Sequence, residues 1–298
     1  MSVDFAAAAG FMAAHGRVLD RRRLGLLLGE NEPDAVLAAV DGYRNRDGGY
    51  GWGLEADLRA PESQPGGALH AFEVFEDVAP ATTPRAVELC DWLESVTLAD
   101  GGLPFALPVA DPTGCAPFWA DADPGVSSLQ STAFTAGVAL RVAAHDPAVA
   151  AHPWLARATR YCFDAIDALD AAPHPIALSF AVRFLDAACE RYAAAPPLLE
   201  RLGRFVPDTG LVPVPGGSEG ETMRALDFAP LPGSPASALL RDGVIEDELD
   251  RLAGQQEQDG GWTVDFASYS PAATLEWRGY ATVHAVLTLQ RAGRLPGI

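Results

Sequence analysis

The chain has 298 residues, 49% of them hydrophobic, and a formal net charge of −19 at pH 7. This acidity disfavours nucleic acid and anionic membrane surfaces as partners, and no run of about 18 apolar residues predicts a membrane-spanning helix. All 21 basic residues are arginine, which excludes Schiff-base chemistry on a lysine.

Two kinds of helix are predicted to alternate along the chain. An N-terminal pair is expected at residues 3–14 and 24–29. Amphipathic helices are then predicted at 33–43, 84–96 and 244–256. Less polar helices are predicted at 67–75, 129–144, 175–192 and 279–289. A helix that is apolar or small on every face is buried all round, so we expect an outer ring of amphipathic helices around an inner ring of buried ones.

Four short phrases of similar sequence punctuate these helices, at residues 46–50, 99–103, 207–211 and 258–262. Each contains Asp followed by one or two Gly, and the aspartates lie 53, 108 and 51 residues apart. The middle interval is two periods, so one copy is expected to be degenerate near Trp154. A fixed period of this size indicates an architecture of stacked copies of one unit.

A long loop follows each phrase, at residues 48–64, 101–128, 210–234 and 260–277. Loops longer than about 12–15 residues are usually functional or disordered, and these contain aromatic and acidic residues. The segments 103–108 and 211–215 are too rich in proline for central strands and are expected to be extended loops. We expect all four loops to gather at the mouth of a central cavity.

The last phrase carries the most specific resemblance. Residues 252–262, with Gln255, Asp259, Gly261 and Trp262, resemble the QW repeat of squalene–hopene and oxidosqualene cyclases; related phrases occur in protein prenyltransferase β-subunits. Residues 44–52 form a recognisable variant. The resemblance implies an all-α fold, a single (α/α)6 toroid of about six helical hairpins over 1–298, with 1–32 as an N-terminal cap or first hairpin. The QW-type residues themselves are expected to be structural.

The catalytic motif of the protonating cyclases is absent from its expected register. In that family an Asp-x-Asp-Asp motif begins an inner helix, often before Thr-Ala, whereas residues 128–131 before Thr132 contain no acid. The nearest acids are Asp121 and Asp123, which are predicted either to share a proton as general acid or to form an Asp-Pro-Gly turn. Phe118, Trp119 and Phe134 are candidates to supply π faces for a carbocation. Together with Asp121 and Asp123 they form the first candidate site.

Two further groups of candidates lie in other loops and in the inner helices. Glu55 and Asp57 either line the cavity or form a solvated loop. His70 and His284 occupy similar places in the first and last inner helices and are either lumen acid–base groups or satisfied core residues.

Another candidate group, of acidic, basic and aromatic residues, lies just before the predicted helix at 279–289 and at its start. Glu276 is a candidate catalytic residue, and Trp277, Arg278 and Tyr280 are candidate substrate-binding residues, with ring closure as the alternative role. Trp52, in the first loop, is assigned to the cavity wall.

No metal or cofactor is predicted. The zinc-binding Asp, Cys and His of the protein prenyltransferases have no counterpart here, and no other metal-ligand spacing appears. The four cysteines are well separated and are expected to be reduced, buried thiols of a cytoplasmic protein.

These features predict a small soluble terpenoid-cyclase-like enzyme that acts on an isoprenoid in an aromatic-lined cavity. One alternative is a non-catalytic toroid that binds a ligand or protein, and another is a carbohydrate-active (α/α)6 enzyme with a carboxylate pair. A homodimer or a partner toroid is a further possibility, because the multi-domain cyclases place their site between two toroids.

Overall fold

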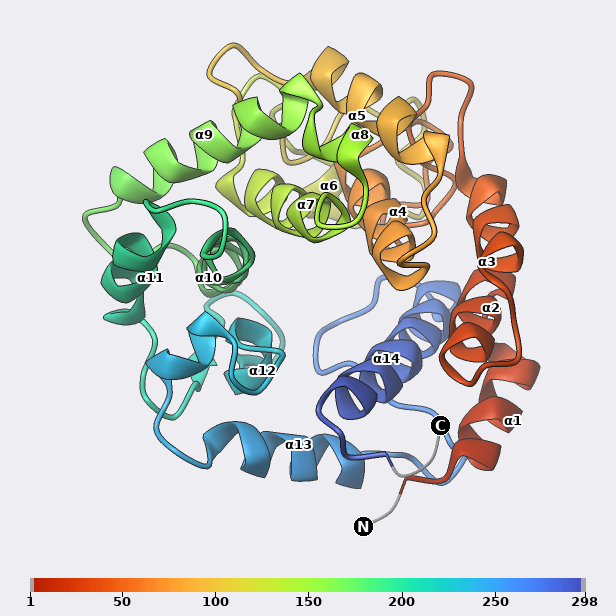
Figure 1. The fold of residues 1–298 in the computed structure, drawn as a ribbon. Helices are drawn as coiled ribbons and strands as arrows, with labels where there is room; N and C mark the ends of the chain where they lie inside the picture. The colour runs from red at the N-terminus through yellow and green to blue at the C-terminus, as the bar shows by residue number, and fades with distance from the viewer. Residues whose placement is uncertain (1–2, 296–298) are drawn as a thin grey trace. The chain divides into compact units, whose positions relative to one another are not determined.

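A computed structural model describes residues 3–295 of the chain. Helices dominate these residues, and the sheet found among them has only two strands, so the all-α prediction is confirmed (Figure 1). The chain divides into two compact units, here called the terminal unit (3–39 and 206–295) and the central unit (40–205). None of the helices within residues 3–295 is both long and apolar enough to cross a bilayer.

The terminal unit joins the two ends of the chain. Its elements are α1 (Phe5–His15), α2 (Val18–Leu27), α3 (Pro33–Val40, whose last residue begins the central unit), β1 (Val212–Pro213), β2 (Thr222–Met223), α12 (Ala225–Phe228), a 3-10 turn (Pro235–Leu239), α13 (Val244–Gly254) and α14 (Pro271–Arg291). Helix α14 packs against α1 and α2, and Phe11, Met12, Trp262, Val283 and Val286 belong to the core between them. The N-terminal segment is therefore part of a folded unit that the C-terminal helix completes.

The central unit contains the clearest alternation of buried and amphipathic helices. Its elements are a 3-10 turn (Asp41–Tyr43), α4 (Pro65–Asp77), α5 (Pro84–Val96), α6 (Pro117–Ala120), α7 (Leu129–Val142), α8 (Pro147–Ala150), α9 (Pro153–Asp167), α10 (Pro175–Ala188) and α11 (Ala195–Gly203). Within this unit α4, α7 and α10 form an inner layer, and α5, α9 and α11 lie outside them (Figure 1). Helix α7 is buried on nearly every face, as its small residues predict.

Three of the four phrases, at 46–50, 99–103 and 258–262, form the same turn with the same hydrogen bonds. Gly48, Gly101 and Gly260 have φ values of 92°, 97° and 93°, in the left-handed region that favours glycine. In each turn Oδ1 of the aspartate accepts a hydrogen bond from the backbone N–H of the second glycine, two residues later. The distances are 3.0 Å for Asp47, 3.1 Å for Asp100 and 3.1 Å for Asp259. The phrases thus have the structural role that the sequence predicts.

Each of these three turns packs closely against a helix of its own unit. A Cβ atom at Gly48 would lie 3.0 Å from the Glu88 carbonyl oxygen of α5, and one at Gly101 would lie 3.1 Å from that of Arg157 in α9. A Cβ atom at Gly260 would lie only 2.2 Å from the carbonyl oxygen of Ala7 in α1. The last turn therefore rests on the first helix as the earlier turns rest on α5 and α9.

Two expectations about element positions are corrected. Trp154, where the degenerate phrase was expected, is fully buried inside α9 and stacks on Phe72 with ring centroids 6.0 Å apart. The missing phrase belongs after α9, where a short link leads directly to α10 and leaves no room for a long loop. Helix α14 begins at Pro271, capped by Ser270, so the residues expected before a helix at 279 lie inside it.

Candidate functional site

Three charged side chains meet in the interior of the central unit. His70 of α4 lies between Glu73, with Nδ1 2.9 Å from Oε2, and Glu55, with Nε2 3.0 Å from Oε2. All three residues are buried, with relative exposures of 6%, 4% and 7%. We call this group the acid–imidazole cluster, and it is the best-defined set of buried titratable groups in the central unit.

Local structure explains why these residues meet. His70 and Glu73 are three positions apart on α4, so their side chains lie on one face. Glu55 belongs to a tight turn in which its carbonyl accepts from Leu58 N–H (3.0 Å) and its Oε1 accepts from Asp57 N–H (3.1 Å). The carbonyl of Asp57, which is also buried, accepts from the N–H of Ala116 at 2.8 Å. The loops after the first and second phrases are thus joined beside the cluster.

The two carboxylates keep His70 protonated. Burial alone lowers the pKa of His70, but the negative charges and hydrogen bonds of Glu73 and Glu55 outweigh it and raise the pKa from 6.5 to about 9. At neutral pH the ring is therefore an imidazolium with both N–H groups engaged. It is a poor general base, because it has no free lone pair to accept a proton.

This charge state predicts a stability that falls with rising pH. Below pH 6.5 His70 is protonated in both folded and unfolded chains; between pH 6.5 and 9 only the folded chain retains the proton, so the stabilisation is lost as pH approaches the folded pKa. The expected decline is up to about 1.4 kcal/mol per pH unit and about 3 kcal/mol in all. Urea unfolding between pH 6 and 9.5 measures it.

The matched control is His70→Gln, which retains a polar side chain but does not titrate. Its unfolding free energy is expected to change with pH by much less than that of the natural chain over the same interval. Equal slopes for the two proteins would show that another group causes the decline and would contradict a protonated His70.

Aromatic rings lie next to the acid–imidazole cluster. Trp119 of α6 stacks on Phe105 with centroids 4.3 Å apart, and Phe118 lies 5.6 Å from Trp119. A Cβ atom at Gly66 would lie 3.4 Å from Glu55 Cγ and 3.5 Å from Trp119 Cη2, which places the indole and the carboxylate side chain around one glycine. The buried Nε1 of Trp119 has no hydrogen-bond partner within residues 3–295. We call Phe105, Phe118 and Trp119 the aromatic trio.

The structure separates Asp121 and Asp123 from this group. Both are exposed, and Asp123 Oδ1 accepts from the backbone N–H of Gly125 at 2.8 Å. This is the geometry of the Asp-Pro-Gly turn. The expectation of a buried pair is therefore corrected, because both side chains are exposed and Asp123 is held in the turn.

Phe134 occupies a different part of the central unit. It lies on α7, stacks on Phe180 of α10 with centroids 4.1 Å apart, and has the Arg183 guanidinium 5.0 Å above its ring. Its aromatic face is thus covered by neighbours from α10. Its predicted role as a cavity wall remains a prediction.

Three of the other candidates form a series of rings along α14 in the terminal unit. Trp277 and Tyr280 lie 5.4 Å apart at nearly perpendicular angles, and Tyr280 lies 4.1 Å from His284. All three are partly exposed, as is Glu276. His284 and His70 belong to different units, and each is held within its own set of neighbours.

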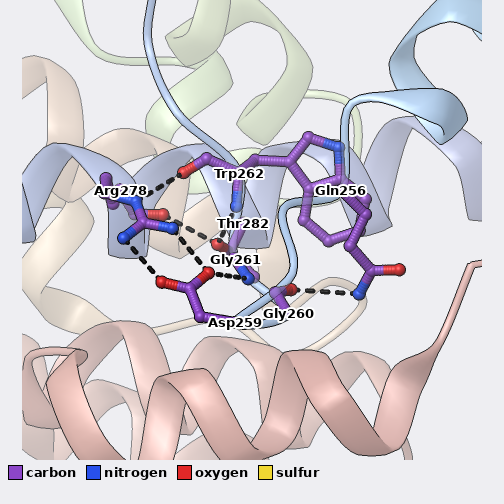
Figure 2. A network of polar contacts seen from close by, with 7 residues as sticks. All are labelled: Gln256, Asp259, Gly260, Gly261, Trp262, Arg278 and Thr282. Carbon is purple, nitrogen blue, oxygen red and sulfur yellow. Dashed lines mark hydrogen bonds and ion pairs between the residues drawn. The ribbon is translucent and has the colours of Figure 1, made fainter.

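Arg278 has a structural role, shown in Figure 2. Its guanidinium binds both oxygens of Asp259, at 2.7 and 2.9 Å, and its carbon lies 4.4 Å from the centre of the Phe11 ring. The backbone N–H of Trp262 donates to Thr282 Oγ1 at 3.1 Å in the same network. Arg278 therefore joins the last turn to α14 and α1, and its predicted role in substrate binding stays a prediction.

The cysteines and potential metal ligands add no second centre. Cys90 and Cys162 are buried, all four cysteines are free, and burial raises the pKa of the Cys90 thiol to about 12. Over residues 3–295, no three His, Cys, Asp or Glu side chains are arranged to hold a metal ion. Neither family models nor curated proteins match this chain.

Glu73 is the functional candidate that the sequence reasoning missed. Glu73 lies in a predominantly apolar helix, where the sequence pattern predicts that an acidic side chain faces solvent. The sequence does contain one sign of its role: Glu73 follows His70 by three residues, a spacing that places the acid and the imidazole on one face of a helix.

Proposed function

We propose that the helical hairpins form an (α/α)6 toroid and that the chain is a terpenoid-cyclase-like enzyme acting on an isoprenoid. The toroid is supported by the alternation of buried and amphipathic helices and by the repeated turns, the last of which rests on α1. The candidate reaction centre is the acid–imidazole cluster with the aromatic trio beside it.

The observation that carries this proposal is a pair of buried carboxylates next to aromatic rings. Glu55 and Glu73 both contact protonated His70, and Trp119 lies next to Glu55. Carboxylates and indole faces both attract a positive charge, and they do so most strongly where water is excluded. Isoprenoid cyclisation and isomerisation develop positive charge on carbon, which such a site would stabilise.

The same geometry limits the chemistry that the cluster can perform. An imidazolium whose pKa is about 9 is a weak acid, whereas protonation of an alkene requires a strong one. Asp121 and Asp123 are exposed to water. The proposed role of the cluster is therefore electrostatic stabilisation of a cationic intermediate, and initiation by proton donation from these groups is not part of the proposal.

Turnover of isoprenoids by Glu73→Gln tests the proposal. The purified protein is incubated with squalene, 2,3-oxidosqualene, geranylgeraniol and geranylgeranyl diphosphate, and the products are analysed by gas chromatography. We expect at least one substrate to be converted, and Glu73→Gln to lower kcat by about 100-fold or more, as for loss of one preorganised charge, with KM within a few-fold. Glu88→Gln, on the exposed face of α5, is the matched control.

Binding of an isoprenoid without conversion would instead support a non-catalytic binding toroid. The carbohydrate-active alternative predicts a carboxylate pair that flanks a sugar. Glu55 and Glu73 do face each other, but the His70 ring fills the space between them. Conversion of none of the isoprenoids and binding of none would contradict the proposed function.

A further inference from the structure

A cavity lies beside the first Asp-Gly-Gly turn, in the central unit. It is open to solvent and has a volume of about 600 Å³. Its lining combines polar residues, including Asn45, Asp47 and Glu62, with an apolar surface that includes Trp92, Leu107 and Pro108. None of these residues belongs to the acid–imidazole cluster or the aromatic trio.

Asn45 has contacts that the turn itself does not require. In the second and last turns, Leu98 and Glu257 occupy its place and make the same backbone hydrogen bonds. The Asn45 amide instead donates to the Pro61 carbonyl at 2.8 Å and to Ser63 Oγ at 3.0 Å, and its oxygen accepts from Trp52 Nε1 at 2.8 Å. Asn45 thus fixes the edge of the pocket and the indole next to it.

Trp52 is an unusual residue for its position. Its φ is 58°, in the left-handed region that costs a residue other than glycine about 1–3 kcal/mol. Its side chain is 59% exposed, so packing recovers little of that cost. Glycine would satisfy the backbone better, yet the chain holds a large aromatic ring here by a hydrogen bond to a residue that lines the pocket.

The charge at the pocket indicates the class of ligand. Both ionisable residues of its lining, Asp47 and Glu62, are acids, and within residues 3–295 neither forms an ion pair with an arginine. Hydrogen bonds hold both carboxylates in place: Glu62 Oε1 accepts from the backbone N–H of Ala110 at 3.2 Å, and Asp47 Oδ1 accepts from Ser63 Oγ at 2.8 Å. Carboxylates attract cations, and exposed indole faces bind ammonium and guanidinium groups.

We infer that this pocket binds a small organic cation, an ammonium or guanidinium group on an apolar stem. The carboxylates of Asp47 and Glu62 attract the charge, the Trp52 face covers it, and the stem lies on Trp92 and Leu107. The site is independent of the proposed isoprenoid chemistry, since it shares no residue with that centre.

Titration of the full chain with two cations and a neutral analogue tests this inference. Choline carries a quaternary ammonium group, and N-acetylarginine amide carries a guanidinium as its only cation, as an arginine within a peptide does. The uncharged isostere of choline is 3,3-dimethylbutan-1-ol. We expect at least one cation to shift the NMR signal of the Trp52 indole N–H and to bind at least tenfold more tightly than its neutral counterpart. Which of the two does so identifies the source of the charge.

Two variants separate binding from folding. Trp52→Gly suits the local φ and is expected to unfold at the same or a higher temperature, yet to weaken cation binding at least tenfold, as is Glu62→Gln. Asp164→Asn, an exposed acid on α9, should bind as the natural chain does. The inference is overturned if neither cation binds more tightly than the alcohol, or if folded Trp52→Gly binds with unchanged affinity in isothermal titration calorimetry.

Discussion

His70→Ala is expected to lower the free energy of unfolding by about 3–5 kcal/mol at pH 7, since it leaves buried carboxylates without their cation. In the natural chain the ring lies within 3.0 Å of both Glu55 and Glu73, and all three side chains are buried. Without the ring, the two negative charges repel each other in the interior. Urea unfolding followed by circular dichroism measures the loss.

The form of the loss is as informative as its size. The deficit of His70→Ala should shrink above about pH 9, where the ring of the natural chain also loses its charge. His145→Ala, at the partly exposed residue after α7, provides the control and should change stability by less than about 0.5 kcal/mol. A deficit in His70→Ala that is the same at pH 7 and pH 10 would indicate lost packing alone.

Gly260→Ala is the second substitution with a large expected effect, a loss of at least about 3 kcal/mol. The added methyl group would lie 2.2 Å from the backbone oxygen and 2.3 Å from the carbonyl carbon of Ala7, and φ at this residue is 93°. Backbone atoms of α1 cannot move aside as a flexible side chain can, so the turn or the helix must shift. Thermal and urea unfolding both report the result.

Gly10→Ala is the matched control, because it adds the same methyl group on α1, which the Gly260 turn contacts. Nothing lies within 4 Å of a Cβ atom at Gly10, which is in a helix interior. There alanine should stabilise by about 0.5–1 kcal/mol. Equal effects of the two substitutions would show that the last turn does not rest on α1.

Much of the fold could be predicted because its signals are local. Proline at the first helical position and glycine in the turns mark helix limits, and the helix predicted at 84–96 is observed with those limits. The helix start predicted at Gly279 is wrong, because α14 begins at Pro271, where Ser270 and Pro271 carry the usual cap signals. A glycine next to buried Asp20 serves close packing there, which the sequence does not reveal.

The candidate site was predictable only in part because it depends on contacts between distant residues. Glu55 and His70 were identified as candidates, but their pairing requires the turn at Glu55 to fold back onto α4. The prediction of Asp121 and Asp123 as a buried acid pair is wrong, because a proline and a glycine next to two acids favour an exposed turn. Trp52 was expected in the central cavity, and its left-handed φ could not be inferred from sequence.

The charge of His70 is the central claim, because the stability profile, the His70→Ala prediction and the proposed electrostatic role all depend on it. Nitrogen-15 NMR of the ring measures it directly. We predict that both ring nitrogens of His70 are protonated at pH 7.5 and that the ring titrates with a pKa near 9. A neutral ring at pH 7.5, with one nitrogen unprotonated, would contradict the account.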